Sequence, residues 1–125
     1  SEAVAKHVQG ARLAAITGGK RAGELAAEYG VPAFCKIDVE GFELEVLRGL
    51  SQPVATLSFE YIPASMDVAL GCIERLEQLG RYEYNQSPGE THQLQAERWL
   101  DAAGMRAVLR GITHHSGDVY ARLLR

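Results

Sequence analysis

The sequence predicts an α/β fold in which a mainly parallel sheet is flanked by helices. Glycine and proline divide the chain into short segments, and strand-like segments alternate with helix-like segments along most of its length. Short apolar runs with β-branched residues indicate strands, and apolar residues at intervals of three and four indicate helices. Repeated alternation of this kind favours parallel strands joined by helical crossovers, which is why we expect this class of fold.

The length and composition fit one soluble globular domain. The chain has 125 residues, of which 46% are hydrophobic and 23% are charged. We expect residues 1–125 to form a single domain, with residues 1–16 as a divergent lead-in. The net charge of -3 and the absence of a Lys/Arg cluster argue against nucleic-acid binding. The apolar runs are far shorter than the ~20 residues that a membrane-spanning helix requires, so we expect no membrane association.

The first half is expected to contain a weak helix at 2–10, a strand at 13–16, a helix at 20–29, a strand at 33–39 and a helix at 43–50. Helix formers fill 20–29, and Gly30 followed by Pro32 marks the end of that helix. Ile37 and Val39 supply β-branched residues for the second strand. The helix at 43–50 has acidic residues at its start and Arg48 near its end, as the helix dipole favours.

The second half is expected to contain a strand at 54–62, a helix at 67–79, a strand at 81–86, a helix at 102–111 and a strand at 118–124. Pro63 stops the first of these strands, Asp67 is the predicted N-cap of the helix that follows, and Gly80 ends that helix. Asp101 is the predicted N-cap of the helix at 102–111. Gly104 weakens this helix by about 1 kcal/mol relative to alanine, so a helix over 95–103 is the alternative.

Cysteine and histidine residues indicate no metal site. Cys35 and Cys72 are far apart and lie in no metal-binding spacing, so we interpret them as buried free thiols. Free thiols suit a reducing compartment, and we expect the protein to be cytoplasmic. His114 and His115 lie close to Asp118, but an adjacent pair in a glycine-bounded turn is typical of a solvated loop, and zinc needs more ligands.

The most distinctive stretch is KIDVEGFELEVLRGL, residues 36–50. Strand alternation places Lys36, Asp38 and Glu40 on one side of the predicted strand at its mouth, and Gly41 permits a tight turn into the helix. A carboxylate at this point can accept hydrogen bonds from a ligand, hold a metal or orient a base. The structural alternative is that Asp38 or Glu40 caps the helix and that Lys36 pairs with either.

This stretch resembles the signature segment of FkbM-family methyltransferases, a strand-four motif K-I-D-x-E-G-x-E followed by V-L-x-G. Three further segments resemble the family in the right order: AGELAAEYGVP at 22–32, TLSFEY at 56–61 and SGDVYAR at 116–122. Together the resemblance covers about residues 17–124. The strand-four motif is fairly specific, whereas each of the other segments is weak alone.

The resemblance implies a Rossmann-like class I methyltransferase fold and methyl transfer from S-adenosylmethionine to an oxygen of a small molecule or sugar. It implies catalytic roles for Asp38 and Glu40, near the methyl group or the acceptor. It implies a cofactor-binding set of Lys36, Asp38 and Glu60, with Glu60 at the end of the adjacent strand facing the same cleft. Lys36 is carried over as a motif residue without a defined role.

The chain also departs from this pattern, because it lacks the half that normally grips the cofactor. Folds of this kind bind the cofactor through a glycine-rich turn after the first strand and an acidic residue after the second. No strand followed by G-x-G-x-G precedes the motif, and Gly18-Gly19 is too short. We therefore expect a C-terminal half with about three strands missing. Leu13–Ile16 is expected to cover the exposed edge of the motif strand, unless two chains pair there.

Three hypotheses about function follow. The chain is part of a working O-methyltransferase, completed by a longer gene product, by a homo-oligomer or by a complementing subunit. Alternatively, it is a non-catalytic remnant that acts as an interaction or dimerisation module. The third possibility is a site for another small anion or a metal at Asp38 and Glu40.

Overall fold

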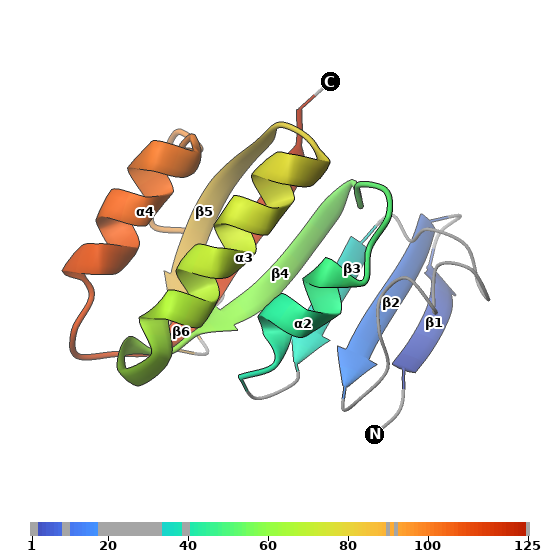
Figure 1. The fold of residues 1–125 in the computed structure, drawn as a ribbon, viewed down its shortest axis with the longest axis horizontal. Coiled ribbons are helices and arrows are strands. Elements are labelled where there is room, and N and C mark those ends of the chain that lie inside the picture. Colours follow the sequence, from blue (N-terminus) through green and yellow to red (C-terminus); the bar gives the residue numbers. More distant parts are fainter. Residues whose placement is uncertain are drawn as a thin grey trace.

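The residues that the structure describes form a six-stranded sheet with strand order β1-β2-β3-β4-β6-β5 (Figure 1). The structure is a computed structural model, and it describes residues 3–8, 11–17, 34–38, 41–89, 91 and 93–124. The strands are β1 (Ala3–Val8), β2 (Ala11–Thr17), β3 (Phe34–Asp38), β4 (Thr56–Tyr61), β5 (Tyr82–Pro88) and β6 (Gly117–Leu123). The strands predicted at 33–39, 54–62, 81–86 and 118–124 are confirmed, with boundaries shifted by one or two residues.

The described helices are α2 (Glu43–Arg48), α3 (Met66–Leu79) and α4 (Ala102–Gly111), with a short 3-10 turn η1 (Pro63–Ser65) before α3. All three helices lie over the same face of the sheet (Figure 1). Strand side chains that point to this face are buried, among them Ile37, Leu57, Phe59, Val119 and Tyr84. The apolar residues that alternate along the strands therefore form one core with the helices.

Of the two predicted N-caps, Asp101 is confirmed and Asp67 is wrong. The side chain of Asp101 accepts a hydrogen bond of 2.8 Å from the Gly104 amide, which confirms it as the N-cap of α4. The alternative helix over 95–103 is wrong, because Leu100 forms a β-bridge with Tyr84 along the outer edge of β5. The prediction for Asp67 is also wrong, since α3 begins one residue earlier and has Ser65 at its N-cap.

The sheet is mixed, so the expectation of a mainly parallel sheet is not met. Only β2–β3 and β3–β4 are parallel, while β1–β2, β4–β6 and β5–β6 are antiparallel. Besides the hairpin of β1 and β2, the two other antiparallel pairs arise in the second half of the chain. Helix α3 carries the chain from β4 to β5 across a gap of one strand, and β6 returns after α4 to fill that gap in the opposite direction.

The lead-in segment forms strands. The weak helix predicted at 2–10 is wrong, because Ala3–Val8 forms β1 and pairs antiparallel with β2. Val4 and Val8 are β-branched, and pairing in a hairpin favours such residues in strands. Strand β2 pairs in parallel with β3, so the prediction that Leu13–Ile16 covers the edge of the motif strand is confirmed. The helix predicted at 20–29 lies outside the described residues.

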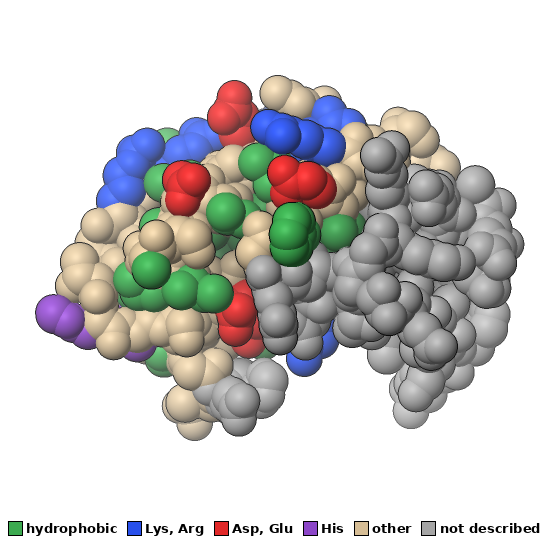
Figure 2. All heavy atoms as spheres, turned by 60° about the horizontal axis from the view of Figure 1, so that its bottom comes forward, with side chains coloured by type: hydrophobic (Ala, Val, Ile, Leu, Met, Phe, Trp, Pro, Cys, Tyr) green, Lys and Arg blue, Asp and Glu red, His purple; other side chains and the backbone are tan. Residues whose placement is uncertain are grey.

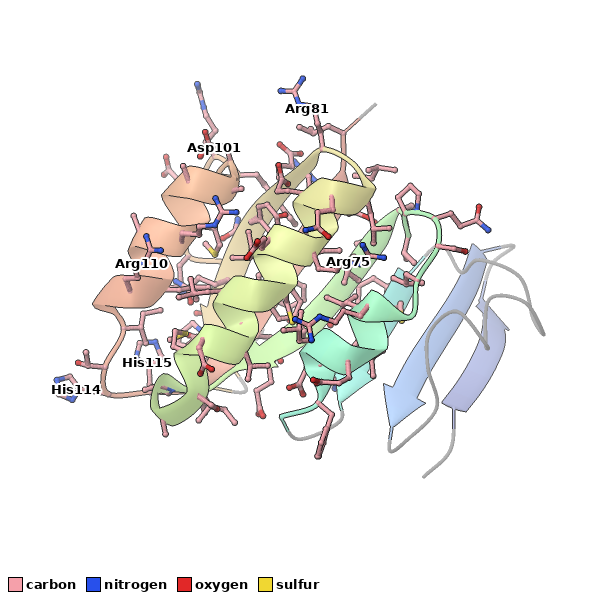
Figure 3. All side chains as sticks on the ribbon, in the orientation of Figure 1. Arg75, Arg81, Asp101, Arg110, His114 and His115 are labelled. Carbon is pink, nitrogen blue, oxygen red and sulfur yellow. The ribbon has the colours of Figure 1, made fainter. Side chains whose placement is uncertain are left out.

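Helix α3 lies at the centre of the core and fixes α2 beside it. Cys72, Ile73 and Leu76 on α3 are fully buried. The side chain of Arg75 points from α3 toward α2 (Figure 3), where its Nε and Nη2 donate hydrogen bonds to the carbonyls of Leu47 (3.3 Å) and Leu50 (2.7 Å). A guanidinium at the end of a helix satisfies carbonyls that have no partner within the helix. The motif helix is therefore held at its C-terminal end by a neighbouring element.

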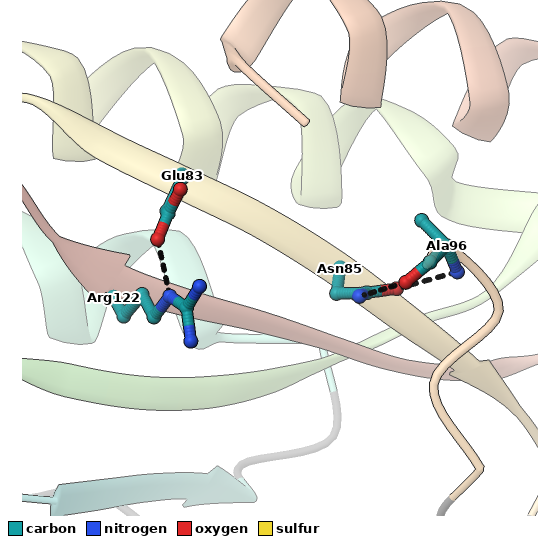
Figure 4. A network of polar contacts seen from close by, with 4 residues as sticks. All are labelled: Glu83, Asn85, Ala96 and Arg122. Atoms are coloured by element: carbon teal, nitrogen blue, oxygen red, sulfur yellow. Dashed lines mark hydrogen bonds and ion pairs between the residues drawn. The ribbon is translucent and has the colours of Figure 1, made fainter. Parts of the chain in front are cut away.

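The outer edge of β5 is covered by residues 93–100. The amide and carbonyl of Tyr84 both bond to Leu100, and the Asn85 side chain both donates to and accepts from the backbone of Ala96, at 2.9 and 3.0 Å (Figure 4). Glu83 and Arg122 form an ion pair across β5 and β6, and the Arg122 guanidinium lies 3.9 Å from the centre of the Trp99 ring. The segment thus closes one edge of the sheet against pairing with another strand.

Candidate functional site

The carboxyl ends of three neighbouring parallel strands, β2, β3 and β4, meet at one edge of the sheet. Thr17, the last residue of β2, pairs with Asp38, the last residue of β3. Ile37 pairs with Phe59 in β4, so Asp38 and Glu60 each follow directly on a paired position. Ligands of open α/β sheets bind beyond the carboxyl ends of parallel strands. The backbone therefore brings two of the predicted site residues, Asp38 and Glu60, to the same level of this edge.

The other two predicted residues have different positions. Lys36 is exposed, while its neighbours Cys35 and Ile37 are buried, so the predicted alternation along this strand is confirmed for these residues. Lys36 pairs in register with Ser58 and lies two residues before the carboxyl end of β3. Glu40 lies outside the described residues. The structure thus puts Lys36 on the face of the strand directed away from the helices.

A third acidic residue, Asp118, lies directly opposite Glu60 in the antiparallel pairing of β4 with β6. Asp118 is in turn paired with Ser87 of β5, whose buried hydroxyl has no hydrogen-bond partner among the described residues. Glu60 and Asp118 are both half-buried. The sequence analysis did not place Asp118 beside Glu60, because this position depends on the insertion of β6, for which no local pattern gives a signal.

The turn between β3 and α2 is built by Gly41 and Glu43. Gly41 has a φ of 99°, in the region that only glycine adopts readily, which confirms the predicted turn. Its amide donates a hydrogen bond of 2.9 Å to Oε1 of Glu43, whose side chain is buried. Phe42 between them is 64% exposed. The turn thus presents an aromatic ring to solvent at the start of α2.

Tyr61 closes the site at the end of β4. Its ring is fully buried, and its hydroxyl donates a 3.1 Å hydrogen bond to Oε1 of Gln86. Burial, with a smaller contribution from the negative charge of Asp118, raises the pKa of Tyr61. The ring of His115 meets Tyr61 edge to face at a centroid distance of 6.0 Å. Tyr61 therefore supports the end of this strand as a neutral, packed side chain.

The histidine pair is solvated, as predicted. His114 and His115 lie on the loop after α4 (Figure 3), and both are exposed. Within the described ranges, no three His, Cys, Asp or Glu side chains lie together in a way that could hold a metal ion. Among the described residues as a whole, no helix is long and apolar enough to cross a membrane.

A groove with a volume of about 350 Å³ opens just after β4, between the start of α3 and the end of α4. Apolar side chains gather on this side of the molecule (Figure 2). The groove is lined mainly by Pro63, Met66, Leu70, Leu109 and Ile112, with Arg110 as its charged residue. Its volume falls at the lower end of the range for small-molecule sites.

The two strands on the outer side of the motif strand differ in direction. In a doubly wound sheet the first strand neighbours the fourth, and β2 occupies that position beside the motif strand β3. Strand β1 occupies the position of the second strand but runs antiparallel to β2. Its carboxyl end therefore lies at the opposite edge of the sheet from the carboxyl ends of β2, β3 and β4.

Comparison with known proteins identifies the family. The family described as "Methyltransferase FkbM domain" matches residues 8–106, which contain β2, β3, α2, β4 and α3. The closing strand β6, which resembles the family in the segment SGDVYAR, lies beyond the matched range. Searches of curated proteins and of solved structures gave no significant match. Because the match spans most of the chain and includes the whole KIDVEGFE motif, this protein belongs to the FkbM methyltransferase domain family.

Proposed function

We propose that the protein forms part of an S-adenosylmethionine-dependent methyltransferase that acts on an oxygen of a small molecule or sugar. Family membership supports methyl transfer as the class of reaction. The observation that carries the proposal is that the parallel strands β2, β3 and β4 end at the same edge of the sheet. Thr17 pairs with Asp38, and Glu60 lies one position past the last β3–β4 pair. This arrangement favours a ligand at the carboxyl edge of the sheet.

The proposed roles follow from charge and position. When bound, the cofactor would supply an electrophilic methyl group and leave as S-adenosylhomocysteine, and the acceptor hydroxyl that takes the methyl group would lose its proton. A carboxylate at the end of β3 can accept the hydrogen bond of that hydroxyl and take up its proton, which is the role we assign to Asp38 and Glu40. We assign cofactor contacts to Asp38, Glu60 and Lys36.

A second polypeptide or further chain is needed to complete the cofactor site in this proposal. The antiparallel direction of β1 supports this requirement, since it leaves the ribose without a carboxylate from the neighbouring strand. A second copy or a complementing subunit would supply the missing groups. The buried free thiols Cys35 and Cys72 favour a reducing compartment such as the cytoplasm. If no partner restores cofactor binding, the alternative is an interaction or dimerisation module without catalysis.

The first test is a calorimetric titration of the purified chain with S-adenosylmethionine and S-adenosylhomocysteine. Saturable binding in the micromolar range would support a cofactor site rebuilt by this chain, and a screen of hydroxyl-containing acceptors would follow. Absence of binding at millimolar ligand, both alone and with candidate partner subunits, would contradict the proposed activity and favour the interaction module. Light scattering at each titration point reports whether binding accompanies assembly.

A further inference from the structure

Glu43 is a buried residue, 3% exposed, and its carboxylate reaches back to the turn that precedes α2. Its Oε1 accepts a hydrogen bond of 2.9 Å from the amide of Gly41, two residues earlier. Burial of a carboxylate is unfavourable unless hydrogen bonds compensate for the lost water. Because Glu43 is buried and bonded to the backbone of the turn, its role is to stabilise the shape of the turn rather than to contribute surface charge.

The backbone angle of Gly41 is a second determinant of the shape of this turn. Its φ of 99° lies in the left-handed region, and a Cβ built at this position would meet nothing within 4 Å. Glycine is thus required for its backbone angle and not for close packing. The backbone angle of Gly41 and the hydrogen bond from Glu43 are two independent determinants of the same turn.

Helix α2 gives Glu43 a fixed base. Val46 and Leu47 are buried in the core, and the amide of Val46 bonds to the carbonyl of Phe42 at 3.2 Å. At the other end of the helix, Arg75 binds the carbonyls of Leu47 and Leu50. With both ends of α2 fixed, a side chain on its first residue can hold the preceding turn in place.

We propose that Glu43 is the positioning residue of the site: it fixes the turn at Gly41 and thereby the position of the exposed ring of Phe42. The consequence for cofactor binding rests on the proposed function. Glu43 acts through the backbone of Gly41 and touches no reacting atom in this role. The sequence motif contains Glu43, but only the structure distinguishes it from Glu45, which lies on the exposed side of the same helix.

Three variants separate positioning from general stability. Glu43→Gln keeps an oxygen acceptor for the Gly41 amide, Glu43→Ala removes it, and Glu45→Ala is the matched control. In NMR hydrogen exchange, we expect the Gly41 amide to exchange ~10-fold faster or more in Glu43→Ala, and within ~3-fold of the native rate in the other two variants. Titration with S-adenosylhomocysteine should show the same order, with affinity ~10-fold weaker only in Glu43→Ala. Denaturant unfolding identifies any variant that fails to fold. If Glu43→Ala does not fold, the exchange rate of the Gly41 amide in Glu43→Gln is compared with the native rate instead.

The outcomes separate this inference from the proposed function. Unchanged Gly41 exchange in Glu43→Ala would overturn the positioning role. Faster Gly41 exchange with unaltered ligand affinity would overturn its link to the cofactor. If the native chain binds no ligand, the proposed function fails, while the exchange of the Gly41 amide still decides whether Glu43 fixes the turn.

Discussion

A Cβ atom on Gly117 would lie 2.6 Å from the hydroxyl oxygen of Tyr61 and 2.2 Å from the carbonyl oxygen of Ser87. Both distances are shorter than real Cβ contacts, and one of the two neighbours is backbone. Gly117 is where β6 begins between β4 and β5. The absence of a side chain at this residue therefore lets β6 enter the sheet beside the buried Tyr61.

Gly117→Ala is expected to destabilise the protein by about 1–3 kcal/mol, the typical cost of overpacking a close-packed site. The measurement is urea unfolding monitored by circular dichroism. Gly111→Ala is the matched control, because a Cβ at Gly111, the last residue of α4, would meet nothing within 4 Å. That control should be neutral or stabilising by up to about 1 kcal/mol, since alanine favours helix more than glycine does. Equal stability of the two variants would contradict the packing argument.

Arg75→Ala is expected to lower the free energy of unfolding by about 1–2 kcal/mol, because two carbonyls at the end of α2 lose a charged donor. Arg48→Ala tests whether charge alone matters. Arg48 is on the same helix, but its side chain is 64% exposed and its ion pair with Glu45 is 4.0 Å long, so its loss should cost less than about 0.5 kcal/mol. Denaturant unfolding of both variants measures the difference, and similar losses would refute the capping role of Arg75.

How far the sequence predicts this fold depends on how local each element's determinants are. The segment from β3 through α2 was predicted within a few residues, since the β-branched Ile37, the turn at Gly41 and the spacing of the apolar helix residues all lie within one short stretch. The antiparallel insertion of β6 was not predictable in the same way. Its place depends on contacts of Gly117 and Val119 with strands far away in the chain.

The same distinction applies to the site. The positions of Asp38 and Glu60 at one edge of the sheet were predictable, because each stands at the end of an apolar strand. Asp118 was not, because its position beside Glu60 follows only from the pairing of β4 with β6. The burial of Glu43 was also not predicted, since acidic residues in the first turn of a helix are typical of exposed positions that interact with the helix dipole.

Stability is expected to fall as the pH rises above about 9, because buried acidic groups stay protonated in the folded protein. Burial raises the pKa of Cys35 from 9.0 to about 12 and that of Tyr82 from 10.0 to about 12. Between these values the unfolded chain releases protons that the folded protein retains, so unfolding becomes more favourable by roughly 1.4 kcal/mol per pH unit for each such group. The stabilisation is fully present below the ordinary pKa and is lost as the pH rises.

Urea unfolding at pH 8 and pH 10.5 measures this loss. Cys35→Ala removes one of the ionisable groups, so the variant should lose less stability over this interval than the native protein, whatever its stability at pH 8. An identical pH dependence of the two proteins would show that Cys35 ionises equally in the folded and unfolded states. Thiol titration at pH 8 offers a second check, because Cys35 and Cys72 are both buried and should react only after unfolding.

The carboxylates of the site are predicted to affect binding and turnover separately. Glu60→Gln removes a charge at the end of β4 and should weaken S-adenosylhomocysteine binding by ~10-fold, the typical effect of losing a hydrogen bond to a charged group. Asp38→Asn in an active assembly should lower the methyl-transfer rate by ~10²-fold or more, as expected for a group that takes up the acceptor's proton. Glu45→Gln, on the exposed side of α2, is the charge-matched control and should change neither quantity.

The two carboxylate variants can be compared with each other because their strands end at the same level of the sheet. Native turnover in Asp38→Asn, with the control unaffected, would remove this residue from catalysis and leave the proton to Glu40. Native affinity in Glu60→Gln would mean that the cofactor does not reach β4. In that case the ligand would have to lie over β2 and β3, because Thr17 pairs with Asp38 on the other side of the motif strand.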